Sequence, residues 1–309
     1  MLAGYLAKIV IAHCLVGAVS DAAAFSFSAN VSGFYLCCLG GQHCPALKNL
    51  KHHTMVSDAE LARRSLKNWG ELLAAVGRYA VGPHAELRRP DALGSRIDSA
   101  GDSPWFNAAV VPVGATPPQA DDASLPYCLW TADAAAGAAG RSENAAIATP
   151  LMGLDLRDAS LKLDDSSASA DEEFQIGEPP LETVGDINGR AYGQTGAAFA
   201  ALVRGLAANG RVRTYGVRDA ATGGYVCVAM ALSVDDDVGV HYVATEACHR
   251  RAGLATRVVT ALLRDARARG ASTATLQATP DGASVYERIG FRRVGTMHAF
   301  VRGGGAASA

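Results

Sequence analysis

The sequence predicts an α/β protein with a mixed β-sheet flanked by helices. Its 309 residues, 49% of them hydrophobic, are enough to form a large buried core. Beyond Glu178, three strand-like segments are followed in turn by a helix, a strand, a helix and a strand. Elements in this order pack as a layered α/β sheet.

The elements of this C-terminal part have clear boundaries. Two helices, 181–192 and 195–208, come first, and Asn209 with Gly210 ends the second. A longer helix, at 254–269, is closed by Gly270, and a short helix covers 283–289. The predicted strands are 212–218, 225–233, 238–243, 273–278 and 291–301.

The first half of the chain is less regular. Apolar positions at helical spacing predict an amphipathic helix over 59–81, and short apolar runs at 106–113 and 127–130 predict strands. We therefore expect a smaller, divergent α+β domain over 55–165, a linker over 166–178, a second domain over 179–302 and a flexible tail over 303–309.

The first 54 residues form a separate segment. The apolar run 9–19, followed by small residues, is similar to a short secretory signal. The composition changes abruptly at Met55, which is the alternative start of the protein. Both interpretations, a targeting segment and an extension outside the true start, stay open.

Charge and cysteine content exclude several classes of protein. The net charge of -2 gives no reason to expect nucleic acid as a partner, and the run 9–19 is too short to span a membrane. Seven cysteines at irregular spacing, three of them close together near the N-terminus, indicate reduced thiols and a cytoplasmic location. Their spacing is not that of a metal site, so we expect no metal.

The segment 243–256 is the most informative part of the sequence. It leaves a strand, turns through a basic loop and opens a helix, which presents free backbone N–H groups and a positive helix dipole to one point. This geometry suits a pyrophosphate. The residues expected to bind it are Arg250, Arg251, Ala252, Gly253, Ala255 and Thr256.

A second motif follows about thirty residues later. With Arg250, Gly253 and Ala255 in the first motif and Tyr286, Gly290 and Phe291 in the second, residues 178–301 resemble the GCN5-related N-acetyltransferase (GNAT) superfamily. The resemblance implies a splayed, mixed β-sheet flanked by helices. Residues 55–165 are then either a degenerate copy of that fold or an unrelated recognition module.

The resemblance also implies a coenzyme site. Acetyl-CoA would be the co-substrate, and its pantetheine arm would pair with the strand edge at Val243 and with the amide of Thr245. Many members of the superfamily have an asparagine where this sequence has Thr279, so we expect Thr279 to replace it.

The predicted catalytic residues are Tyr286, His241 and Glu246. A tyrosine keeps its proton at neutral pH, so Tyr286 would act as the general acid that protonates the leaving thiolate; the alternative is a packing role under the short helix. The amine must lose a proton, and His241 and Glu246 are the candidate bases.

These expectations define an N-acetyltransferase that moves an acetyl group to a primary amine by direct attack in a ternary complex. The expected acceptor is a small-molecule amine, and a protein α-amine or lysine is the alternative. A non-catalytic acyl-CoA sensor or interaction protein with the same fold is a further alternative.

Overall fold

The computed structural model describes residues 28–30, 33–35, 55–79, 96–97, 107–115, 126–133, 147–158, 160–163, 174–193 and 206–301. The chain divides into two compact units, Met1–His53 and Thr54–Ala309. In the first unit, β1 (Ser28–Asn30) pairs antiparallel with β2 (Gly33–Tyr35). The predictions for the rest of residues 1–54 and for the tail 303–309 lie outside the described residues.

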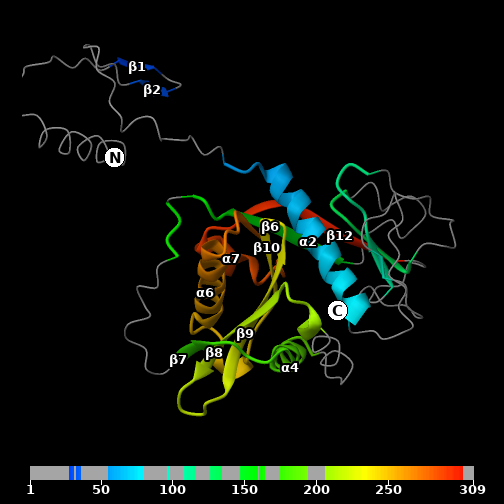
Figure 1. Ribbon diagram of the computed structural model, residues 1–309, viewed down its shortest axis with the longest axis vertical. Helices are drawn as coiled ribbons and strands as arrows, with labels where there is room; N and C mark the ends of the chain where they lie inside the picture. The colour runs from blue at the N-terminus through cyan, green and yellow to red at the C-terminus, as the bar shows by residue number, and fades with distance from the viewer. Residues whose placement is uncertain are drawn as a thin grey trace, which may run out of the picture. The chain divides into compact units, whose positions relative to one another are not determined.

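Ten strands of the described residues form one open sheet in the second unit (Figure 1), in the order β3-β4-β5-β12-β6-β11-β10-β9-β8-β7. The pairs β10–β11 and β4–β5 are parallel, and the other neighbours are antiparallel. The sequence's prediction of a mixed sheet is confirmed. The strands are β3 (Arg96–Ile97), β4 (Ala108–Val110), β5 (Cys128–Thr131), β6 (Ile147–Asp155), β7 (Phe174–Gly177), β8 (Val212–Asp219), β9 (Tyr225–Val234), β10 (Asp237–Thr245), β11 (Thr273–Gln277) and β12 (Arg292–Val301).

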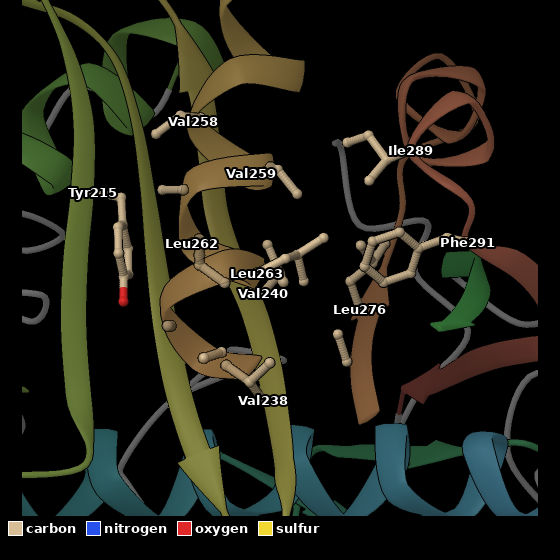
Figure 2. Close-up of a cluster of buried hydrophobic side chains, with 14 of the residues drawn as sticks. Tyr215, Val238, Val240, Val258, Val259, Leu262, Leu263, Leu276, Ile289 and Phe291 are labelled. Carbon is tan, nitrogen blue, oxygen red and sulfur yellow. The ribbon is translucent and has the colours of Figure 1, made fainter. Parts of the chain in front are cut away.

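Helices cover both faces of the sheet. On one face, α6 (Leu254–Ala268) and α7 (Ala283–Ile289) pack on β8 to β11. Figure 2 shows Val259 and Leu263 of α6 within the cluster that includes Val240 of β10 and Leu276 of β11. The apolar side of α6 therefore holds this helix on the sheet. Its N-terminus directly follows the predicted phosphate loop.

The opposite face is covered by α2 (Asp58–Tyr79) and α4 (Leu181–Ala191). Leu66 and Leu72 of α2 and Ile187 of α4 are almost completely buried in one apolar cluster with Met230 of β9. The helix α2 contacts β6, β12, β11, β10 and β9, and it crosses the sheet in Figure 1. The predicted helix over 59–81 is thus a major part of the core of this unit.

The expected division into two domains is not visible as two compact units. Residues 54–309 form one unit, and β6, from the first half of the chain, lies between β11 and β12. The last residues of the expected linker form β7, where Phe174 pairs with Asp219 of β8. The physical reason is that backbone N–H and C=O groups need partners. Strands from both halves of the chain supply them to one another, so the described strands of 55–165 extend one sheet.

The C-terminal elements lie close to their predicted bounds. Two 3₁₀ turns, η3 (Leu206–Ala208) and η4 (Ala247–His249), complete the described elements, and most of the predicted helix 195–208 lies outside them. The strand β6 was not predicted, because its segment follows a stretch rich in alanine and glycine and contains Pro150. None of the helices in the described ranges is long and apolar enough to cross a bilayer.

Candidate active site

The sheet opens between its two central parallel strands. β10 pairs with β11 only from Asp237 to Gly239, opposite Thr273 to Thr275, although both strands continue further. At the point of separation a Cβ on Gly239 would lie 2.0 Å from Oδ1 of Asn68 in α2. Glycine is therefore required where the α2 side chain enters the opening.

The separated part of β10 contains a β-bulge. Its pairing with β9 shifts between His241 and Ala244, and Tyr242 has a φ of 51°. Val243, within the bulge, has no ladder partner on β9 or β11. The hydroxyl of Tyr192, just after α4, lies 3.5 Å from the Val243 carbonyl oxygen. Val243, predicted to bind the pantetheine arm, thus pairs with neither neighbouring strand, and the Tyr192 hydroxyl is the group that contacts its carbonyl.

The strand runs into a loop that ends at the N-terminus of α6. Arg251 and Gly253 both have positive φ, of 70° and 75°, and Gly253 is the N-cap residue. The cap forms no side-chain hydrogen bond, so the first N–H groups of α6 have no partner within the helix. A Cβ at Gly253 would meet nothing within 4 Å. The loop therefore presents an accessible, positively polarised helix end, as the sequence predicts.

Two side chains of the loop bind the end of α4. Glu246 forms an ion pair with Arg190, with an Nη2–Oε1 distance of 2.7 Å. Arg250 donates through Nε to the Thr245 carbonyl at 3.2 Å and through Nη2 to the Ala191 carbonyl at 3.4 Å. Arg250 thus fixes the conformation of the loop and holds it against the C-terminal end of α4.

Tyr286 of α7 packs its ring edge-on against Phe291, with 5.9 Å between the centroids. Burial raises its pKa, and the nearby Tyr192 and Cys227 raise it further. Cys227 is contacted in turn by the Thr245 hydroxyl, 3.2 Å from its Sγ. Among the described residues its hydroxyl forms no hydrogen bond. The geometry therefore accommodates both predicted roles of Tyr286, as packing residue and as proton donor.

His241 lies on the α2 side of β10 and is 5% exposed. Its Nε2 lies 3.0 Å from Oδ1 of Asn68. The amide nitrogen of Asn68 donates to Asp237 and Leu232, so His241 is the donor in this contact. Burial lowers the pKa of His241 to about 3, which keeps the ring neutral. A buried, bonded ring of this kind is poorly placed to take a proton from an amine.

Asp237 begins β10 and is also buried. It accepts hydrogen bonds from Thr273 and Thr275 of β11, both at 2.7 Å, and from Asn68 at 3.0 Å. Burial raises the pKa of its carboxyl group to about 6, although these hydrogen bonds act in the opposite direction. This cluster of polar groups closes the α2 side of the opening.

The remaining residues predicted to bind the coenzyme lie in the loop, in the first turn of α6 and just before α7. Arg251 and Ala252 are exposed in the loop, and Ala255 and Thr256 are half-buried in the first turn of α6. Thr279 is exposed before α7, and its hydroxyl accepts a hydrogen bond from the amide of Gly282. Its side chain therefore already stabilises the turn.

Sequence reasoning missed Tyr192, Arg190 and Asn68. The first two terminate a helix that the sequence located correctly, but nothing in the sequence shows that this end meets the loop. Asn68 is a polar residue that falls on the buried side of an amphipathic helix. A polar residue at a position where the pattern calls for an apolar one was the signal that could have identified Asn68.

An open sheet with a helix N-terminus beside the separation of two parallel strands is the fold expected from the sequence. Residues 214–303 match the family model described as an acetyltransferase (GNAT) domain. Residues 214–303 of this chain are therefore a GNAT domain.

One solved structure agrees at the level of the fold. The chain resembles a GCN5-related N-acetyltransferase from Kribbella flavida, with a TM-score of 0.54 and 18% identity over 79% of this chain and 96% of that one. It also matches a GCN5-related N-acetyltransferase from Sphaerobacter thermophilus, with a TM-score of 0.46 and 11% identity over 56% and 58% of the chains. A structure described as a predicted acetyltransferase with acetyl-CoA, from Clostridium acetobutylicum, matches with a TM-score of 0.35 and 17% identity over 38% of this chain and 90% of that one. No curated protein sequence matches the chain.

The buried histidine predicts a pH effect on stability. The pKa of His241 is about 3 in the folded protein and ordinarily 6.5, so its stabilising contribution is complete above pH 6.5 and is lost as the pH falls. Gln can still donate to Asn68 but does not titrate. We expect the stability of His241→Gln relative to the wild type to rise by about 1.4 kcal/mol per pH unit below pH 6.5.

Urea unfolding of both proteins at pH 7, 6, 5 and 4.5 measures this difference. Asp237 titrates in the same range, but it does so in both proteins, so its effect cancels in the difference. Its raised pKa contributes stability at low pH, and this contribution is lost as the pH rises from 3.8 to about 6. A difference between the two proteins that stays constant with pH would show that His241 titrates normally.

Proposed function

We propose that this protein is an N-acetyltransferase that transfers the acetyl group of acetyl-CoA to a primary amine. The observation that carries the proposal is the unpaired edge of β10 at Val243, which leads within ten residues to the free N-terminus of α6 at Gly253. One feature offers backbone hydrogen bonds to an extended amide-containing arm, and the other suits a pyrophosphate. Acetyl-CoA contains both groups. Its supply inside cells agrees with a cytoplasmic location.

In the proposed reaction both substrates are held together. The amine nitrogen attacks the thioester carbonyl carbon, and a backbone N–H near Val243 stabilises the oxyanion. The C–S bond then breaks and the thiolate takes a proton from Tyr286. At neutral pH the phenol of Tyr286 carries its proton and can donate it to the thiolate.

The amine also has to lose a proton. Of the two predicted bases, Glu246 lies on the loop beyond β10, and its carboxylate side chain is 24% exposed beside Arg190. His241 is buried on the α2 side and held by Asn68. We therefore assign proton removal to Glu246, directly or through water, in preference to His241.

The expected acceptor is a small-molecule amine, and a protein amine is the alternative. The helix α2 fills the sheet face beneath the opening, with Ser65 and Asn68 fully buried there. An acceptor on that side would have to fit around this helix, which favours a small amine.

The coenzyme site is tested by adding charge at the helix end. Gly253→Glu places a carboxylate where we expect the pyrophosphate, and Gly253→Gln adds similar bulk and the same backbone strain without the charge. We expect the Kd for acetyl-CoA to rise by more than about tenfold for Gly253→Glu relative to Gly253→Gln. Calorimetric titration of the full chain measures both values. Failure of the folded wild type to bind acetyl-CoA would rule out the proposed function.

The catalytic role of Tyr286 is tested separately. Tyr286→Phe keeps the ring packed against Phe291 but removes the proton donor, so we expect kcat to fall about 10²-fold or more with an almost unchanged Kd for acetyl-CoA. Steady-state kinetics on a panel of small amines and peptides gives kcat. Unchanged turnover would assign Tyr286 to packing alone, and binding by the wild type without turnover on any amine would favour the acyl-CoA sensor.

A further inference from the structure

The opening between β10 and β11 is bridged by a helix from outside the family-matched segment. The helix α2 belongs to residues 58–79, whereas the match covers 214–303. It nevertheless contacts both strands, with polar side chains directed at the place where the strands part.

Asn68 spans the point of separation. Its Nδ2 donates to Oδ2 of Asp237 at 3.0 Å and to the Leu232 carbonyl at 3.2 Å, and its Oδ1 accepts from His241 at 3.0 Å. Asp237 lies in the paired part of β10, and His241 is the last residue before the bulge. The side-chain amide of Asn68 thus links the residues before and after Gly239, and both its nitrogen and its oxygen form hydrogen bonds.

The same helix also holds β11. Ser65 donates to the Leu276 carbonyl at 3.4 Å, and the side chain of Gln277 donates to the Ser65 hydroxyl at 2.8 Å. The Nη1 of Arg64 lies 2.9 Å from the Thr273 hydroxyl. One side of α2 therefore contacts both separated strands through buried or partly buried hydrogen bonds.

We propose that Asn68 is a positioning residue for the coenzyme site. By fixing the path of β10 from Asp237 to His241, it sets where the bulge begins and so where the unpaired edge at Val243 lies. The N-terminal helix is then a component of the site of the GNAT domain. This inference rests on the proposed function, because the edge matters only if the coenzyme binds to it.

The chain offers an exchange of partners that separates positioning from simple stability. In Asn68→Asp the new carboxylate faces Asp237 and can no longer donate to it. Adding Asp237→Asn restores a donor–acceptor pair between these positions, and the carboxylate at position 68 still accepts from His241. The Leu232 carbonyl loses its side-chain donor in both variants, and the Thr275 hydroxyl can accept from the new amide, so the two variants differ chiefly in the pair 68–237. Leu72→Ala is the matched control, because it removes a buried apolar group from α2 without changing any hydrogen bond of Asn68.

The test compares these three variants of the full chain with the wild type. We expect the Kd for acetyl-CoA to rise at least about tenfold in Asn68→Asp and to return to within about threefold of the wild type in the double variant. Leu72→Ala should lower Tm by several degrees and leave Kd unchanged within about twofold. Wild-type affinity in Asn68→Asp, or an equal loss in Leu72→Ala, would overturn the proposal.

A second readout does not depend on the coenzyme. Hydrogen exchange of the backbone amides from His241 to Thr245, measured without coenzyme, should accelerate in Asn68→Asp and recover in the double variant. If the wild type binds no acetyl-CoA, the proposed function fails, and this readout still decides whether Asn68 fixes β10. Unaltered exchange in Asn68→Asp would refute that role.

Discussion

The separation of β10 from β11 after Gly239 is the constraint on which the rest of the structure depends. Backbone N–H and C=O groups inside a sheet need partners, and two parallel strands that part in its centre leave such groups without a ladder. Polar side chains of α2 enter from one face, while α6 and α7 pack on the other. The backbone of Val243 pairs with neither neighbouring strand, and in our proposal it is the part that binds the ligand.

This constraint explains why the two halves of the chain form one unit. A sheet whose central strands separate loses backbone hydrogen bonds there. Hydrogen bonds and apolar contacts from α2 span the separation between β10 and β11. β6, from the same half of the chain, completes the ladder between β11 and β12. The N-terminal half therefore stabilises the strands that shape the proposed coenzyme site.

Sequence reasoning predicted those features that local patterns encode. The turn and helix start at Gly253 and the segment around Tyr286 were predicted because glycine positions and helical spacing specify them within a few residues. The path of β10 was predicted only in part: a strand was expected at 238–243, but nothing local indicates a bulge at Tyr242.

Features that depend on distant contacts were not predicted. The insertion of β6 between β11 and β12 joins residues more than a hundred positions apart, and no periodicity records it. His241 alternates normally within its strand, so only the structure shows that α2 buries it and that Asn68 binds its ring. Arg250 was expected to contribute charge to a phosphate, and its bond to the end of α4 depends on how that helix packs.

A crystal structure of the full chain grown with coenzyme A tests the central claim most directly. We predict a pantetheine arm alongside β10 with hydrogen bonds to the backbone of Val243, and a pyrophosphate at the N–H groups that follow Gly253. A coenzyme bound elsewhere on the chain, with β10 and β11 still separated and the Val243 edge empty, would contradict the account.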